Sequence, residues 1–153
     1  MLRRLVAGTA ALVLVAEAAV VVLVHVVLGR TTESQSMSIA GSDPDVMSMA
    51  TYVLGAGMGG FLLLCAGLLG FAAVRDRAPA RFARGVLFGA AVTHGLLGAL
   101  VVGLVGWSAF AVLMLALCLI VLALMLYTGT PGRDAGPGAD GNGRISGIRP
   151  TSP

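Results

Sequence analysis

The chain has 153 residues, of which 58% are hydrophobic and 11% charged, and its mean hydropathy is +0.97. This composition excludes an ordinary water-soluble domain, in which about a quarter of the residues carry charge. The formal net charge of +3 does not indicate nucleic acid as a partner, because all ten basic residues are arginines that are scattered or lie at the ends of apolar runs. We therefore expect a membrane protein, and the absence of lysine indicates a GC-rich bacterial genome.

Four apolar runs follow one another along the chain, at residues 5–28, 47–74, 83–107 and 109–128. A bilayer hydrocarbon core about 30 Å thick requires about 20 helical residues, and each run meets that length. The sequence predicts an all-α integral membrane protein, with a left-handed four-helix bundle within residues 1–130. The predicted transmembrane helices cover about 5–28, 45–75, 83–107 and 109–128.

The first run raises the question of a cleavable signal peptide. Arg3 and Arg4 precede it, and Ala16-Glu17-Ala18 has the small-x-small form of a cleavage site. The run continues to Leu28, however, and cleavage would leave a new terminus inside a hydrophobic segment. We expect an uncleaved first helix.

The arginines predict the orientation. Three groups occupy alternate ends of the runs: Arg3 and Arg4 before the first, four arginines at 75–84 between the second and third, and three at 133–149 after the fourth. Short cytoplasmic segments are enriched in arginine, so both termini should lie in the cytoplasm of a bacterium, with the protein in its plasma membrane. Residues 131–153 are rich in Gly and Pro and poor in apolar residues, which predicts a disordered cytoplasmic tail.

The ends of the predicted helices carry local signals. Asp43 is suited to cap the second helix, with Pro44 at its first position. A turn over 106–108 should separate the third and fourth helices, with Ser108 starting the fourth. Tyr52, Trp107 and Tyr127 fall near the membrane interfaces, where aromatic side chains with a polar edge serve as anchors.

Small residues recur four positions apart in the second and third runs. The candidate helix-packing residues are Gly55, Gly59, Gly60, Gly85 and Gly89. Association of helices in lipid depends on close backbone approach, which such residues allow. We expect them either to pack helices within the fold or to form the interface of an oligomer.

Two polar residues lie deep in odd-numbered runs. Glu17 is 12 residues beyond Leu5, and His94 is 11 beyond Ala83; at about 1.5 Å per residue, both lie near the bilayer midplane. We hypothesise that Glu17 and His94 meet, either as a polar clasp between helices or as a proton-relay or substrate site. His25 lies nearer the outer surface and is expected to reach toward it.

Cys65 and Cys118 lie at a depth similar to that of Glu17 and His94. Such a set binds zinc in some proteins, but here every ligand would come from a different helix, so we expect no metal and no cofactor. The methionines at 47 and 49 are a weak signal for Cu(I). The sequence has no CxxC, no HExxH, no phosphate-binding glycine loop and no nucleophile elbow, and we expect that the protein is not an enzyme.

A chain of four short helices with a glutamate in the middle of the first, here Glu17, is similar in outline to the small multidrug resistance transporters. That resemblance implies a dimer in which the glutamate exchanges protons for cationic drugs. The chain departs from the family in its longer outer loop, its tail and the lack of an aromatic cluster on the second and third helices, so membership is not inferred. We expect a non-catalytic scaffold or accessory subunit of a membrane complex, whose partners are the lipid bilayer and either a second copy or another membrane protein. The alternative is a small proton-coupled transporter that uses Glu17 and His94.

Overall fold

The structure is a computed structural model that describes residues 1–35 and 43–128; the predicted tail at 131–153 lies outside the described residues. The described chain is all-helical. Its helices are α1 (Leu2–Gln35), α2 (Pro44–Arg75), α3 (Arg81–Leu104) and α4 (Trp107–Thr128). All four are long and apolar enough to span a membrane, and α4 is the most apolar, with a mean hydropathy of 3.1 over its most apolar window.

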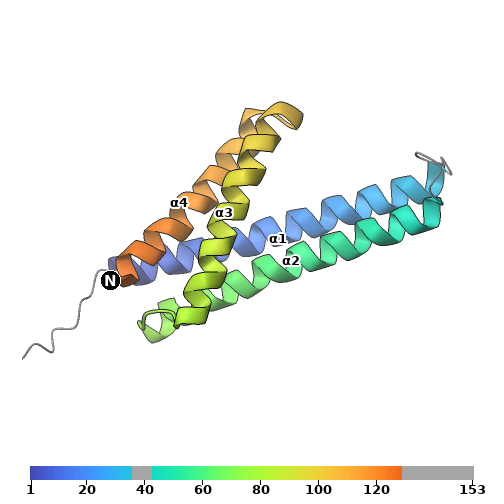
Figure 1. The fold of residues 1–153 in the computed structure, drawn as a ribbon. Coiled ribbons are helices and arrows are strands. Elements are labelled where there is room, and N and C mark those ends of the chain that lie inside the picture. Colours follow the sequence, from blue (N-terminus) through green and yellow to red (C-terminus); the bar gives the residue numbers. More distant parts are fainter. Residues whose placement is uncertain (36–42, 129–153) are drawn as a thin grey trace, which may run out of the picture.

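The helices α1 and α2 form one hairpin, and α3 and α4 form a shorter one (Figure 1). The predicted start of α2 is confirmed: Pro44 is at the first turn, and the Asp43 side chain accepts a hydrogen bond of 3.0 Å from the amide of Asp45. At its other end α2 stops at Arg75, because Asp76 adopts the left-handed conformation at φ 51°.

The turn between α3 and α4 differs from the prediction. It consists of Val105 and Gly106 rather than residues 106–108, and α4 starts at Trp107 instead of Ser108. Gly106 has φ +112°, a backbone conformation that glycine adopts without steric cost. The position of the turn is set by Gly106, the residue that tolerates a positive φ. Hydropathy does not indicate which residue adopts such a φ.

The packing between α1 and α2 explains two of the predicted glycines. A Cβ at Gly55 would overlap the His25 side chain, and one at Gly59 would overlap Val22. These glycines therefore let the two backbones approach closely.

The other three glycines make no close contact with a neighbouring helix among residues 1–35 and 43–128. A Cβ at Gly60, Gly85 or Gly89 would meet nothing within 4 Å in the described part of the chain, so these glycines do not bring the described helices together. The alternative that they form the interface of an oligomer stays a prediction. Spacing along the sequence shows which residues share a helix face, but it does not show whether that face has a neighbour.

The core lies where the two hairpins overlap. Each helix contributes a stripe of buried residues at helical spacing, mostly alanine and leucine. The principal cluster contains Ala10, Leu14 and Ala18 from α1; Leu62, Cys65, Ala66 and Leu69 from α2; Leu87, Ala90 and Ala91 from α3; and Ile120 and Ala123 from α4. Farther from the N-terminus of α1, the two hairpins diverge from each other (Figure 1).

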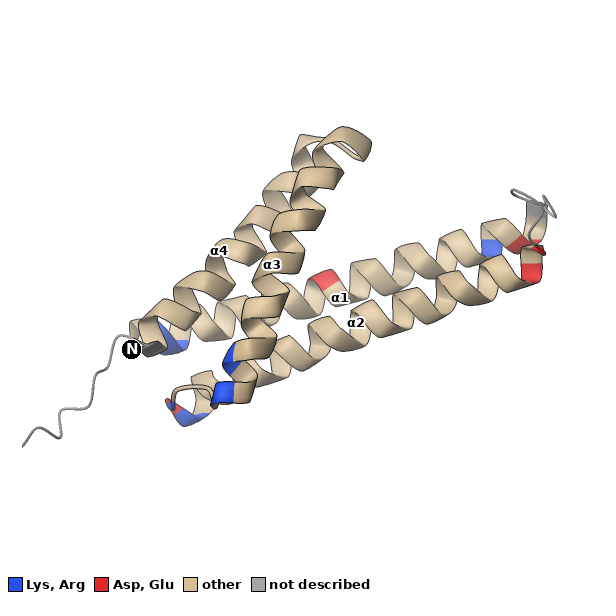
Figure 2. Ribbon diagram, in the orientation of Figure 1, with Lys and Arg blue, Asp and Glu red and all other residues tan. Residues whose placement is uncertain are grey.

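Charged residues gather at the ends of the hairpins, with one acidic position in the middle of α1 (Figure 2). At the N-terminal end of α1, six arginines accompany a single carboxylate within the described chain: Arg3, Arg4, Arg75, Arg77, Arg81, Arg84 and Asp76. At the other end of the long hairpin, Arg30 accompanies Glu33, Asp43 and Asp45. We call these the basic end and the acidic end.

Candidate functional site

The structure brings together the two polar residues that the sequence placed at similar depth. The Nε2 atom of His94 lies 3.0 Å from Oε2 of Glu17. His94 is buried and Glu17 is partly buried, with exposed side-chain fractions of 3% for His94 and 10% for Glu17. The contact joins α1 to α3, and therefore joins one hairpin to the other.

A second hydrogen bond fixes the tautomer of the imidazole. The Nδ1 atom of His94 lies 2.7 Å from the carbonyl oxygen of Ala90. Because a carbonyl oxygen only accepts, Nδ1 must carry a proton and donate it. Ala90 lies one helical turn before His94 on α3, so α3 itself orients the imidazole ring.

This tautomer determines how many protons the Glu17–His94 pair holds. With a proton already on Nδ1, the short contact between Nε2 and Oε2 requires one more proton between these atoms. The pair is then either a carboxylic acid and a neutral imidazole or a carboxylate and an imidazolium. Its net charge is zero in both forms, which is the least costly state in an apolar surrounding.

The pair lies at the point where the hairpins separate. The principal core cluster ends at Ala18 on α1, one residue beyond Glu17, and at Ala91 on α3, three residues before His94. Beside the pair, two apolar cavities of about 490 and 180 Å³ open between the hairpins, and Glu17 lines both. The carboxyl group therefore contacts packed core on one side and open space on the other.

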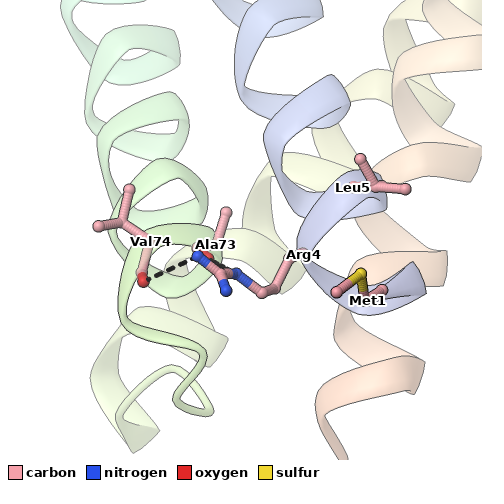
Figure 3. Close-up of a pocket in the computed structure, with 5 residues that line it drawn as sticks. All are labelled: Met1, Arg4, Leu5, Ala73 and Val74. Carbon is pink, nitrogen blue, oxygen red and sulfur yellow. Dashed lines mark hydrogen bonds between the residues drawn. The ribbon is translucent and has the colours of Figure 1, made fainter.

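At the basic end, α1 is tied to the end of α2 by two neighbouring arginines. Arg3 donates to both carboxylate oxygens of Asp76, at 2.6 and 2.8 Å. Arg4 donates to the carbonyl oxygens of Ala73 and Val74, at 2.9 and 3.5 Å (Figure 3). The carbonyls at the end of a helix lack partners within the helix, and Arg4 satisfies two of them.

The hydrogen bond from Arg3 lowers the pKa of Asp76, and the nearby positive charge of Arg3 acts in the same direction. The sequence does not predict these contacts of Arg3 and Arg4. The one available signal was an acidic residue, Asp76, among the arginines at the same end.

Tyr127 also has a role that the sequence did not predict. It was expected to anchor the fourth helix at an interface, but its side chain is buried, with 3% of the residue exposed. Its hydroxyl donates a hydrogen bond of 3.0 Å to the carbonyl of Ala72 on α2. Arg3 lies over the Tyr127 ring, 5.8 Å from its centre. Tyr127 is thus a second polar link between the hairpins.

The remaining candidate residues lie apart from the Glu17–His94 pair. The Nδ1 atom of His25 donates to the carbonyl of Val21 at 2.8 Å, and its Cβ packs on Gly55. Cys65 is buried in the core, whereas Cys118 is exposed on α4. Within residues 1–35 and 43–128, no three His, Cys, Asp or Glu side chains are grouped so that they could hold a metal ion.

Comparison with protein-family models, with curated proteins and with solved structures finds no match to the chain. What the fold and site define is a four-helix protein in which two apolar hairpins are joined by a net-neutral acid–imidazole pair.

Proposed function

We propose that the chain is a four-pass integral protein of a bacterial plasma membrane, with both termini in the cytoplasm. Four helices of sufficient length and hydropathy support this topology. The unequal charge of the two ends supports the orientation, because the basic end carries six arginines and the acidic end carries one. The basic end would then face the cytoplasm.

We propose that the protein is a non-catalytic scaffold or accessory subunit of a membrane complex. The observation that supports this role is that Glu17 and His94 bind each other across the two hairpins. The polar groups within the apolar segments are thereby used to hold the fold together. Tyr127 contributes in the same way near the basic end.

A proton-coupled transporter is the second candidate. One observation favours it: the Glu17 carboxyl group borders the cavities between the hairpins, so a mobile species could reach it. The two candidates make opposite demands on Glu17. A clasp needs a hydrogen bond to His94, whereas a proton carrier needs a group that titrates.

The substitution Glu17→Gln separates these demands. A glutamine amide can donate to the neutral Nε2 of His94 and preserve the link, but it does not titrate. For a clasp, we expect Glu17→Gln to keep the free energy of unfolding within about 1 kcal/mol of the parent. Glu17→Leu should lose about 1–3 kcal/mol, because it leaves the Nε2 atom of His94 without a hydrogen-bond partner. Unfolding in mixed micelles with increasing SDS measures both.

Proton flux provides the matching functional measurement. Purified protein reconstituted in vesicles that contain a pH-sensitive dye should show no more proton flux than empty vesicles. The scaffold proposal also requires that the tagged protein purify from native membranes with a partner in fixed stoichiometry. Flux that is present in the parent and lost in Glu17→Gln would overturn the scaffold proposal in favour of transport.

A further inference from the structure

The two cavities beside Glu17 form one furrow between the hairpins. They share four lining residues, Glu17 and Val21 on α1, Val101 on α3 and Leu113 on α4. The larger cavity, of about 490 Å³, continues past Val105 at the turn between α3 and α4. That volume falls within the range of about 300–1,000 Å³ that is typical of small-molecule sites.

The polar groups that line the furrow offer acceptors. One Glu17 oxygen, Oε2, is engaged by His94, and the other, Oε1, has no hydrogen-bond partner among residues 1–35 and 43–128. In that described part, every side-chain nitrogen or oxygen that is fully buried has a hydrogen-bond partner. Because Oε1 has none, it is not fully buried, and since Glu17 lines the furrow, Oε1 is accessible from it. Thr93 donates its hydroxyl proton to the carbonyl of Gly89, which leaves its oxygen free to accept.

The imidazole adds no free donor. Both ring nitrogens of His94 are engaged, one with Ala90 and one with Glu17. A molecule in the furrow must therefore supply its own O–H or N–H donor to Oε1 of Glu17. Apart from Glu17, Thr93 and His94, the residues that line the furrow have aliphatic or aromatic side chains or, at Met58, a thioether. The rest of that molecule must therefore be apolar.

The charge of the site restricts the molecule further. The Glu17–His94 pair is net neutral and holds one shared proton, so it presents no unbalanced charge to the furrow. An ion in this apolar space would lack a counter-charge, which is costly away from water. The site therefore suits an uncharged donor, which among hydrophobic molecules is most simply a hydroxyl group.

We propose that this furrow binds an uncharged hydrophobic molecule that carries a hydroxyl group, with the hydroxyl donating to Oε1 of Glu17. The molecule would enter sideways from the lipid, so this inference rests on the proposed membrane location. Two sources share the chemistry: aliphatic alcohols, which include diacylglycerols, and lipid-soluble phenols, which include quinols.

Photolabelling tests the proposal with the protein reconstituted in phosphatidylcholine vesicles. The probes are a hexadecanol with a diazirine in its chain, its methyl ether, the corresponding alkylammonium, and an alkylphenol with the same photoreactive group. Labelled peptides are identified by mass spectrometry. We expect a hydroxyl probe to label the furrow residues of α1, α3 and α4 about fivefold more than the ether does, the effect of one hydrogen bond. Whether the alcohol or the phenol is preferred identifies the source.

Three variants locate the binding. Val20→Trp fills the furrow from an exposed position on α1 and should remove the preference for the hydroxyl. Glu17→Leu removes the acceptor and should do the same. Leu12→Trp is the matched control, because Leu12 is 73% exposed on the same helix and does not line the furrow; it should keep the preference.

Equal labelling by the alcohol, the phenol and the ether would overturn the proposal, since acyl chains would then simply fill the furrow. Stronger labelling by the alkylammonium than by the alcohol and the phenol would overturn the proposal as well, because the site would then select a positive charge. A preference that persists in Val20→Trp would place the binding elsewhere and overturn it, even if Glu17→Leu fails to fold. The scaffold role is tested separately, by proton flux and by co-purification with a partner. Its failure in those experiments would not change the labelling result.

Discussion

Individual residues carry the links between the helices. Glu17 and His94 meet at 3.0 Å within the apolar part of the fold, and the backbone carbonyl of Ala90 determines which imidazole nitrogen faces the acid. Arg3 and Asp76 form a two-point ion pair at the basic end, where each side chain is more than one-third exposed. The side chains of Glu17 and His94 are at most one-tenth exposed, whereas the Arg3–Asp76 ion pair is open to solvent.

We predict that the Arg3–Asp76 ion pair makes stability depend on acid pH. Since the pKa of Asp76 is lowered in the folded protein, its contribution is complete above the pKa of an unfolded aspartate, about 3.9, and is lost as pH falls through the lower folded value. Unfolding midpoints of the parent and Asp76→Asn should differ by a constant amount above about pH 5 and converge below about pH 4. A difference that does not change with pH would contradict this assignment.

At the level of the helices, two glycines determine how closely α1 and α2 pack. Gly55 faces the Cβ and Cγ atoms of His25, which are close to the backbone and have little freedom to move. Gly59 faces Val22, a β-branched residue with a restricted rotamer. Gly60 lies on the same helix but faces open space, which makes it a natural control.

We predict that Gly55→Ala destabilises the protein and that Gly60→Ala does not. A methyl group at Gly55 would force α1 and α2 apart or displace His25, at a cost of about 1–3 kcal/mol. At Gly60 the same change meets nothing within 4 Å and removes a glycine from a helix, a gain of up to about 1 kcal/mol. Unfolding in SDS mixtures compares the two. Equal gains in the two variants would contradict the prediction, because helix propensity and not close packing would then dominate at both positions.

The whole molecule is two hairpins that are joined over part of their length. The core, the Tyr127 link and the arginine contacts lie toward the basic end, and the Glu17–His94 pair joins the hairpins at the edge of the core. Beyond the core the two hairpins diverge (Figure 1). The arrangement leaves an open side toward the turn between α3 and α4. In the proposed topology this open side faces the outer half of the membrane.

We predict that the acidic end is outside the cell. Single cysteines replace Ser34, at the acidic end of α1, or Ala78, in the link between α2 and α3; both positions are exposed. The background is Cys118→Ser, since the native Cys118 is exposed. A membrane-impermeant maleimide should label position 34 in intact cells and position 78 only after permeabilisation. Labelling of position 78 alone in intact cells would reverse the orientation.

The sequence by itself determined the features that depend on position along a helix axis. The lengths and hydropathy of the apolar runs predicted the number of helices, and Asp43 with Pro44 predicted where α2 begins. Counting the rise per residue also placed Glu17 and His94 at similar depth, and the structure joins them. These inferences succeed because position along a helix axis follows directly from residue count.

Only the tertiary structure decided what depends on rotation about an axis and on the angle between hairpins. A helix that is apolar on every side gives no signal of which face has a neighbour, so Gly55 and Gly60 were indistinguishable until α1 was placed against α2. The same is true of the buried Tyr127 hydroxyl and of the furrow beside Glu17. Contacts between distant segments, and not the local pattern, set these features.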